Sequence, residues 1–146
     1  MFSLVAYLIR YLVTVQESLK STKKGLKNSN MLLQEAQEIA HLGFWELDLG
    51  ENKLFWNDEV YRIFGLEPQE FEATFEGFLS YVHPEDRDAL TKEYRQSVEE
   101  KRSYHLVHRI IQKNGSVRYV EEYCEHSYDH DGQAVRSIGT VYDITE

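Results

Sequence analysis

Residues 104–144 have the sequence YHLVHRIIQKNGSVRYVEEYCEHSYDHDGQAVRSIGTVYDI, which is rich in β-branched and aromatic residues. Within it we expect strands over residues 104–112, 117–128 and 134–144. The intervening turns contain Asn114-Gly115 and Asp131-Gly132, the residue pairs that most strongly favour tight β-hairpins. The stretch therefore predicts three consecutive antiparallel strands.

Two further strands are expected upstream. Residues 44–49 (FWELDL) alternate between apolar and acidic side chains, and residues 53–57 (KLFWN) follow a turn at 50–52. A lone two-stranded hairpin is marginally stable in water. We therefore expect all five strands to form one antiparallel sheet.

Helices are expected between the second and third of the five strands. A short helix over residues 58–64 ends at Gly65, and Thr74 begins another that runs to about Val82. His83-Pro84 opens a longer helix, because proline suits a first helical turn, and its buried stripe is expected at Leu90, Tyr94 and Val98. Helices inserted here must cover one face of the sheet, which predicts an α+β domain with a pocket between sheet and helices.

The N-terminal part differs in charge from the rest of the chain. Residues 1–30 contain five basic residues and one acidic residue, whereas residues 31–146 contain eleven basic and twenty-four acidic residues. Asn28–Asn30 offer capping side chains for a helix over residues 31–40, which Gly43 would stop. These features predict an N-terminal helix and linker over residues 1–28 and a domain over residues 29–146.

Two interpretations of the N-terminal helix remain open. Residues 1–15 are apolar apart from Ser3, Arg10 and Thr14, and four lysines follow; lysines after an apolar helix are expected on the cytoplasmic side of a membrane. Fifteen residues are fewer than the ~20 that span a bilayer. The alternative is an amphipathic helix that packs on a partner helix through the stripe Leu4, Leu8, Tyr11, Val15 and Leu19.

Composition excludes several classes of protein. The net charge of −9 makes nucleic acid an unfavourable partner. The single cysteine, Cys124, excludes internal disulfides and multi-cysteine zinc sites and suits a reducing compartment.

Five segments in this order resemble PAS domains, in particular the subtype that carries His-Pro-Glu-Asp-Arg and ends in Asp-Ile-Thr. The segments are AQEIAHLGFWELDL (36–49), LFWNDEVYRIFGL (54–66), FLSYVHPEDRDAL (78–90), HRIIQKNGSVRYVEE (108–122) and IGTVYDITE (138–146). The resemblance implies a five-stranded sheet of order 2-1-5-4-3 with helices on one face. It also implies a sensory and dimerising module upstream of an output domain such as a histidine kinase or diguanylate cyclase.

The resemblance also bears on cofactors. Light-sensing, flavin-binding relatives carry a reactive cysteine on a helix within an Asn-Cys-Arg-Phe-Leu run, which this sequence lacks; Cys124 lies in a predicted strand. Haem-binding relatives place an axial histidine on the long helix, and residues 87–102 contain none. His126 lies in a predicted strand and His130 at the turn beside Asp131-Gly132, so their spacing does not fix a shared face. We therefore expect no flavin, haem or metal, while an unidentified small ligand stays open.

The geometry of the family's sheet turns one face of each strand toward the pocket. This face brings His108 and Glu122 together, either as part of a ligand site or as a satisfied buried pair. We expect these side chains to fill the pocket rather than to leave room for a ligand. The pocket candidates are Trp45, Trp56, Phe64, Tyr94, His108, Glu122, Cys124, His126 and Val141.

The opposite face of the sheet is expected to be a protein contact surface in a homodimer, because it exposes many apolar and aromatic side chains. Helix 31–40 is its natural cover, either within the chain or across the dimer. The residues on this outer face are Val107, Ile111, Tyr119, Tyr123, Ile138 and Tyr142.

The C-terminal residues Asp143-Ile144-Thr145-Glu146 are expected to join the last strand to an outgoing helix. Thr145 could cap that helix, and the negative charge of Asp143 would interact favourably with the positive end of the helix dipole. The alternative is a plain helix cap without a regulatory role.

No trio of nucleophile, base and orienting group can be assembled, and no phosphate-binding glycine loop is present. The sequence therefore predicts a non-catalytic sensory module that passes a signal to a C-terminal output domain. The alternative is the N-terminal fragment of a histidine kinase or diguanylate cyclase whose catalytic part lies beyond residue 146. Either protein would be cytoplasmic, and anchored at the inner face of the membrane if the membrane-proximal interpretation of residues 1–15 holds.

Overall fold

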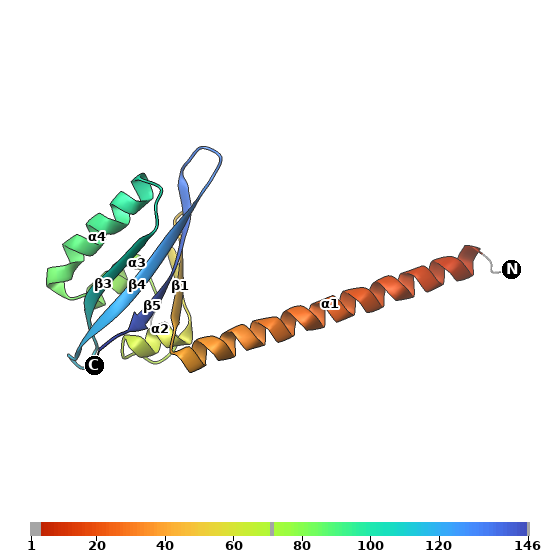
Figure 1. The fold of residues 1–146 in the computed structure, drawn as a ribbon, viewed down its shortest axis with the longest axis horizontal. Helices are drawn as coiled ribbons and strands as arrows, with labels where there is room; N and C mark the ends of the chain where they lie inside the picture. Colours follow the sequence, from red (N-terminus) through yellow and green to blue (C-terminus); the bar gives the residue numbers. More distant parts are fainter. Residues whose placement is uncertain (1–3, 71, 146) are drawn as a thin grey trace. The chain divides into compact units, whose positions relative to one another are not determined.

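The computed structural model describes residues 4–70 and 72–145. The chain divides into two compact units, Met1–Ile39 and Ala40–Glu146. The second unit contains all the strands and the three shorter helices (Figure 1). In chain order its elements are β1 (Gly43–Asp48), β2 (Lys53–Trp56), α2 (Asp58–Ile63), α3 (Phe75–Tyr81), α4 (Pro84–Glu99), β3 (Tyr104–Ile111), β4 (Val117–Tyr128) and β5 (Ala134–Asp143).

The five strands form one antiparallel sheet of order β2-β1-β5-β4-β3. The expected fold class and strand order are thus confirmed. Gly115 and Gly132, in the two hairpin turns, have positive φ angles of 88° and 81°, a conformation that glycine adopts without a steric penalty. β3 and β5 each end one residue earlier than expected, at Ile111 and Asp143.

The centre of the sheet is built around a close approach at Gly139. This residue of β5 lies opposite Trp45 of β1 and Cys124 of β4. A Cβ atom on Gly139 would lie 2.1 Å from the Tyr123 carbonyl oxygen and 2.6 Å from the Trp45 ring. The missing side chain therefore makes room for the indole ring that lies across the inner face.

The hydrophobic core lies between this inner face and helices α2–α4. Phe64 and Leu90 supply large buried side chains from the helical layer, and Leu47, Val120 and Val141 supply them from the sheet. The buried stripe of α4 differs from the expected one at its C-terminal end. Val98, which was expected to be buried, is half-buried, and its neighbour Ser97 is fully buried. The hydroxyl of Ser97 is buried there because it finds two hydrogen-bond partners, described below.

Polar side chains begin the three helices. The side chain of Asn57 accepts from Val60 N at 3.2 Å, so β2 ends at Trp56 and residue 57 caps α2. Thr74 Oγ1 accepts from Gly77 N at 3.0 Å, and His83 Nδ1 accepts from Glu85 N at 3.1 Å. These contacts satisfy amides that have no partner within the helix. The helix starts predicted at Thr74 and His83 are confirmed.

The acidic start of α4 is tied to the sheet. Asp86 accepts hydrogen bonds from the Arg109 backbone at 2.8 Å and from its guanidinium at 2.8 and 3.1 Å. Hydrogen bonds from Arg109 are the main reason that the pKa of Asp86 falls to about 2. The His-Pro-Glu-Asp-Arg segment therefore both begins a helix and clamps it to β3.

The described residues of the first unit all belong to helix α1, which runs from Leu4 to Ala40, the first residue of the second unit. Asn28–Asn30 lie inside this helix and do not cap a separate one. The reason is that no proline interrupts the segment, and an isolated asparagine lowers helix stability by only a few tenths of a kcal/mol. The compact sheet unit begins at Ala40, and the domain boundary expected at residue 29 stays a prediction. In the described residues no helix is both long and apolar enough to cross a membrane; residues 1–3 of the apolar run lie outside that part.

Candidate functional site

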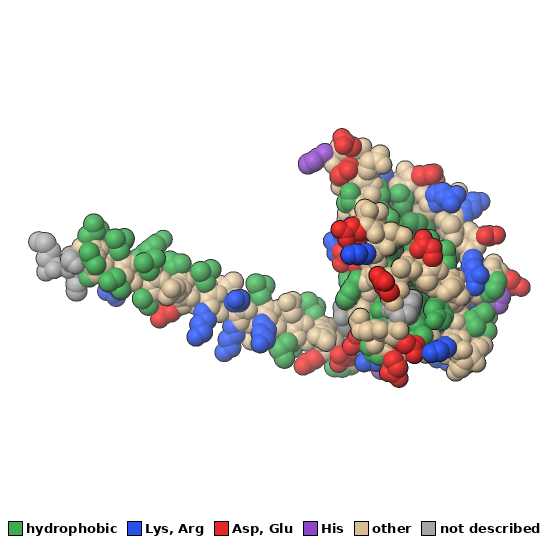
Figure 2. All heavy atoms as spheres, turned by 180° about the vertical axis from the view of Figure 1, so that it is seen from behind, with side chains coloured by type: hydrophobic (Ala, Val, Ile, Leu, Met, Phe, Trp, Pro, Cys, Tyr) green, Lys and Arg blue, Asp and Glu red, His purple; other side chains and the backbone are tan. Residues whose placement is uncertain are grey.

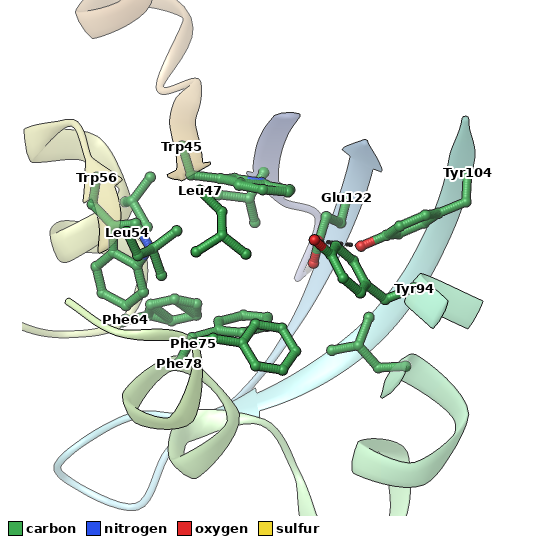
Figure 3. A pocket seen from close by; sticks show the side chains of 13 residues that line it. Trp45, Leu47, Leu54, Trp56, Phe64, Phe75, Phe78, Tyr94, Tyr104 and Glu122 are labelled. Atoms are coloured by element: carbon green, nitrogen blue, oxygen red, sulfur yellow. Dashed lines mark hydrogen bonds between the residues drawn. The ribbon is translucent and has the colours of Figure 1, made fainter. Parts of the chain in front are cut away.

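A small cavity of about 30 Å³ lies between the sheet and the helices (Figure 3). A buried water needs roughly 10–15 Å³ measured in this way, so the cavity has room for one or two water-sized groups. Almost all of its lining is apolar or aromatic. Glu122 contributes the carboxylate among the lining residues.

The structure separates the predicted pocket residues into two groups. Those that line the cavity are Trp45, Trp56, Phe64, Tyr94, Glu122 and Val141. His108, Cys124 and His126 do not line it. His108 and Cys124 are buried on the same inner face of β3 and β4, and His126 is half-buried.

Sequence reasoning missed several lining residues: Leu47, Leu54, Val60, Phe75, Phe78, Leu90 and Tyr104. Two signals could have found some of them. Tyr104 has the same alternation phase as His108 on β3, and Phe75 and Phe78 are three residues apart on α3, so they share one helix face. Figure 3 shows Phe75 and Phe78 on the side of the cavity opposite Trp45.

Glu122 is the centre of a buried hydrogen-bonded trio. Tyr104 donates its hydroxyl to Glu122 Oε1 at 3.0 Å, and His108 Nε2 lies 2.8 Å from Glu122 Oε2. The carboxylate and the imidazole are each about 3% exposed. The predicted proximity of His108 and Glu122 therefore exists, with Tyr104 as a third member.

Burial and charge act in opposite directions on this trio. Burial by itself lowers the pKa of His108, but the hydrogen bond and the negative charge of Glu122 raise it above its usual value overall. Burial, and then Glu122, raise the pKa of Tyr104 well above its usual value. The contact with Glu122 thus shifts His108 toward its protonated form, while Tyr104 remains a neutral phenol over a wider pH range.

A second buried network connects α4 to the sheet. His126 Nε2 lies 2.8 Å from Ser97 Oγ, His126 Nδ1 lies 2.7 Å from Ser137 Oγ, and Tyr94 Oη lies 2.8 Å from Ser137 Oγ. Ser97 donates to the Tyr94 carbonyl at 2.7 Å. Burial lowers the pKa of His126, so its neutral form is favoured.

The donors of this network can be assigned by elimination. Because Ser97 donates its hydroxyl proton to the Tyr94 backbone carbonyl, its oxygen accepts a hydrogen bond from Nε2–H of His126. His126 Nδ1 then accepts from Ser137, and Ser137 accepts from the Tyr94 hydroxyl. Ser97 and Ser137 were not among the sequence candidates, because a small hydroxyl residue in an apolar stripe carries no signal until its partners are known.

Cys124 has no nucleophilic character here. It is fully buried, and burial raises the pKa of its thiol to about 12. Because the thiolate is the reactive form of cysteine, the thiol is inert at neutral pH. The chain's single cysteine is in β4 rather than on a helix. Together with a cavity of water size, this arrangement does not fit a flavin that forms a cysteine adduct.

The outer face of the sheet carries the predicted contact residues. Val107, Tyr119, Tyr123 and Tyr142 are exposed, with Tyr119 at 49%, while Ile111 and Ile138 are half-buried. Polar pairs are interspersed with them, since His105 pairs with Glu121 and Tyr123 donates to Glu125. The face is therefore an apolar and aromatic surface with embedded charges.

The C-terminal residues form a clasp on β4. Tyr119 N donates to Thr145 Oγ1 at 2.8 Å, and Ile144 N donates to the Tyr119 carbonyl at 2.9 Å. Asp143 accepts from Thr145 N and from Arg118, each at 2.9 Å. Burial alone would raise the pKa of Asp143, but the hydrogen bonds from Thr145 and Arg118 lower it. The hydroxyl of Thr145 is thus bound to β4, and Glu146 lies outside the described residues.

No group of three or more His, Cys, Asp or Glu side chains is arranged to hold a metal ion in residues 4–70 and 72–145. His126 and His130 do not meet. His126 is engaged with two serines, and His130 is exposed in the turn before β5.

Comparison with known proteins identifies the family. The sequence pattern of the PAS fold matches residues 53–141. The chain belongs to the PAS family. It is 29% identical over 92% of its length to a blue-light-activated histidine kinase of Brucella anthropi and 24% identical over 93% to a probable diguanylate cyclase, DgcE, of Escherichia coli.

The relatives are much longer proteins. The chain matches 27% of the length of the Brucella kinase and 12% of that of the cyclase. Among solved structures, a sensory box histidine kinase/response regulator from Burkholderia thailandensis has a TM-score of 0.68 at 21% identity, covering 77% of this chain and 84% of that one. The chain is therefore a PAS sensory domain homologous to parts of larger signalling proteins.

Proposed function

We propose that this chain is a non-catalytic sensory and dimerisation module that passes a signal to an output domain C-terminal to it. One observation carries the proposal: the cavity wall and the C-terminal clasp share strands. Glu122 and Val141 line the cavity, and Tyr119 and Asp143 of the same two strands hold the clasp. A change inside the cavity would thus act on β4 and β5, where the chain leaves the sheet.

The related proteins support a particular class of output domain. The two relatives named above are a histidine kinase and a diguanylate cyclase, which supports an output activity of one of these two classes in the parent protein. The alternative, that the chain is the N-terminal fragment of such an enzyme, is compatible with the sensory role. The reading frame after Glu146 tests the output domain that both require: a kinase or cyclase motif supports it, and a stop codon directly after Glu146 contradicts it.

The Brucella relative is blue-light-activated by name, yet we propose that this chain does not use flavin photochemistry. The inert thiol of Cys124 and the cavity of about 30 Å³ support this. Purified protein should show no flavin or haem absorption band. A bound chromophore recovered in stoichiometric amount would contradict it and would require the cavity to open.

Homodimerisation through the outer face is the second part of the proposal, with helix 31–40 as an additional cover. The exposed aromatic residues of β4 and β5 support it, because contiguous apolar surface of this kind is typical of contact sites. The apolar start of α1 followed by lysines supports a position at the cytoplasmic side of a membrane.

The direct experiment uses the full-length parent protein. Deleting residues 41–146 while keeping the reading frame should leave the output activity measurable but unresponsive to the stimulus of the intact protein. A substitution in the exposed 112–116 turn, Ser116→Ala, serves as the control and should respond normally. Unaltered regulation in the deletion variant would overturn the sensory assignment.

A further inference from the structure

The hydrogen-bond network around His126 attaches the C-terminal half of α4 to the sheet. The Tyr94 hydroxyl donates to Ser137 of β5, which donates to His126 of β4. His126 in turn donates to Ser97, and Ser97 donates back to the Tyr94 carbonyl. Ser97 and Ser137 are both 0% exposed. Every hydroxyl proton and both ring nitrogens are used once, so the network suits a neutral imidazole.

Protonation of His126 conflicts with the direction of these hydrogen bonds. A proton on Nδ1 turns that nitrogen from an acceptor into a donor, so Ser137 has to turn its own hydroxyl proton away. If that proton turns to the Tyr94 oxygen, the Tyr94 proton loses its acceptor instead. In either case one hydroxyl proton is left without a partner inside the fold, which is costly for a buried group. Water can bind all of these groups once α4 has moved off the sheet.

The titratable side chains around the His126 ring are neutral near pH 7. The ring centroids of Tyr94 on α4 and Tyr104 on β3 lie 5.3 and 6.3 Å from that of His126, and burial raises the pKa of both phenols. Cys124 Sγ lies 4.0 Å from Nδ1, and burial raises the pKa of this thiol to about 12. β5 contributes the Ser137 hydroxyl. Burial is thus uncompensated and lowers the pKa of His126.

The charged side chains of the neighbouring elements are bound to other partners. Glu122, on the same face of β4, is held by the trio described above. In the turn after α4, Lys101 lies over the Tyr128 ring, and Arg102 is paired with two carboxylates. In the described residues no carboxylate is hydrogen-bonded to His126. A proton taken up by this imidazole therefore finds no counter-charge while α4 is packed on the sheet.

The two ends of α4 are held in different ways. At the N-terminal end, hydrogen bonds from Arg109 hold the pKa of Asp86 at about 2, so this clamp stays charged in mild acid. The C-terminal end depends on the His126 network and on the Tyr128 hydroxyl, which donates to the Val98 carbonyl at 3.0 Å. Acid therefore weakens the attachment of one end and spares the other.

We propose that protonation of His126 releases the C-terminal half of α4 from the sheet, so that acidification is an input which this sensory module detects. The release is a property of the sheet unit, whereas its use as an input rests on the proposed function. Because the pKa of His126 is lowered in the packed state, the attachment is fully stable above about pH 6.5 and weakens as pH falls below it. Tyr94 also lines the cavity, so the release alters the cavity wall.

Hydrogen exchange of the whole chain, followed by NMR, tests the release. Between about pH 7.5 and about pH 5, the opening equilibrium constant of the Ser97 and Val98 amides, corrected for intrinsic exchange, should rise at least about threefold. The amides of Ala89 and Leu90, in the clamped half, should change less. His126→Gln should remove the rise, because glutamine keeps a donor and an acceptor but cannot take up a proton.

The control variant is His130→Gln. Acidic side chains are spread over the face of the sheet unit that Figure 2 shows, and their negative charge favours protonation of any exposed histidine. His130 is exposed in the turn before β5, so its replacement should leave the acid response of α4 unchanged. Acid opening that persists in His126→Gln overturns the proposal, and so does its absence from the unaltered chain.

A titration of the unaltered chain decides the case if His126→Gln does not fold. The Cε1 proton of His126, followed by NMR, should titrate with a midpoint below about pH 6.5. A midpoint at or above this value overturns the release. Global unfolding is a poor measure, because the raised pKa of His108 changes stability with pH in the opposite direction.

The full-length parent protein tests the input. Its output activity should change between about pH 7.5 and about pH 6, and His126→Gln should remove that change. A pH-independent output in a parent protein whose regulation still requires residues 41–146 overturns the input and leaves the sensory function standing. Regulation that survives deletion of these residues overturns both.

Discussion

At the scale of single residues, the interior is determined by a few contacts that allow little variation. Gly139 accommodates the Trp45 ring, Glu122 holds both Tyr104 and His108, and His126 connects two serines. Each of these positions lies on the inner face of the sheet. Their substitutions should therefore affect stability more than equivalent changes on the outer face.

Gly139→Ala should lower the free energy of unfolding by at least about 2 kcal/mol, because the new methyl group would overlap the Trp45 ring and a backbone oxygen. Thr140→Ala, on the next residue and the opposite face, is the control and should cost less than about 1 kcal/mol. Urea unfolding measures both. An alanine at 139 that is tolerated as well as the control would show that the sheet centre can shift.

Glu122→Gln should destabilise the domain by about 1–3 kcal/mol, since it removes a buried charged acceptor. His108 has a raised pKa in the folded state, so its stabilising effect is complete below the unfolded pKa of about 6.5 and is lost as pH rises through the raised value. The difference between parent and variant should accordingly be larger near pH 6 than near pH 8.5. NMR titration should show the pKa of His108 lowered in the variant.

Glu121→Gln provides the matched control for that experiment. Glu121 pairs with His105 on the exposed face of the same two strands, where ion pairs contribute about 0–1 kcal/mol. Equal losses for the two variants at both pH values would contradict the importance of burial for the Glu122 pair.

At the scale of elements, the end of β5 is held by contacts with β4. Thr145 and Asp143 bind Tyr119 and Arg118 of β4, so the clasp and the cavity wall move with the same strands. The cap that Thr145 is expected to give an outgoing helix stays a prediction. The relay proposed for the junction can operate by release of these contacts with β4.

Asp143→Ala and Thr145→Ala should alter the output activity of the full-length protein or its response to stimulus, because each frees the exit of the chain from β4. The melting temperature should stay within a few degrees, since the contacts are partly exposed. Ser116→Ala is the control. If both variants signal normally, the clasp is only a cap and has no part in the relay. If both variants unfold the domain, the clasp is needed for stability and the relay is unsupported.

The outer face gives a second prediction at this scale. Tyr119→Glu combined with Ile138→Glu should weaken self-association in sedimentation velocity, because two charges would enter an apolar contact surface. Gln96→Glu with Gln133→Glu adds the same charge away from this face and should leave association unchanged. If both double variants associate as the parent does, the outer face is not the dimer contact.

At the scale of the whole molecule, the chain consists of a long helix and a sheet unit that differ in charge and in burial. All hydrophobic residues of the core belong to the second unit. The stability of the fold should therefore not depend on the first part of α1.

A chain that begins at residue 29 should retain a cooperative thermal transition, because it keeps every core residue. A chain that begins at Ala40, where the compact unit starts, should behave similarly. Differential scanning calorimetry provides the measurement, with the full chain as reference. Loss of the transition in the version beginning at residue 29 would show that α1 contributes to folding.

The strands, hairpins and helix starts could be predicted from residues that are close together in the sequence. Asn114-Gly115, Asp131-Gly132, Thr74 and His83-Pro84 act through contacts within a few residues of themselves, so their effect is visible without the fold. Alternation on β3 and β4 likewise predicted the pairing of His108 with Glu122 once the resemblance indicated which face was inner. The 2-1-5-4-3 order came from the resemblance.

Contacts between distant segments required the tertiary structure. Ser97 meets His126 and Thr145 meets Tyr119 across 29 and 26 residues, and no local pattern indicates such partners. The same holds for the size of the cavity, because it depends on how Phe75 and Phe78 of α3 pack toward Trp45 and not on the identity of any one residue. The continuity of α1 through Asn28–Asn30 is the converse case. There the capping signal was present, but a capping side chain begins a new helix only where the backbone before it is not helical, and in this chain helix α1 is continuous to Ala40.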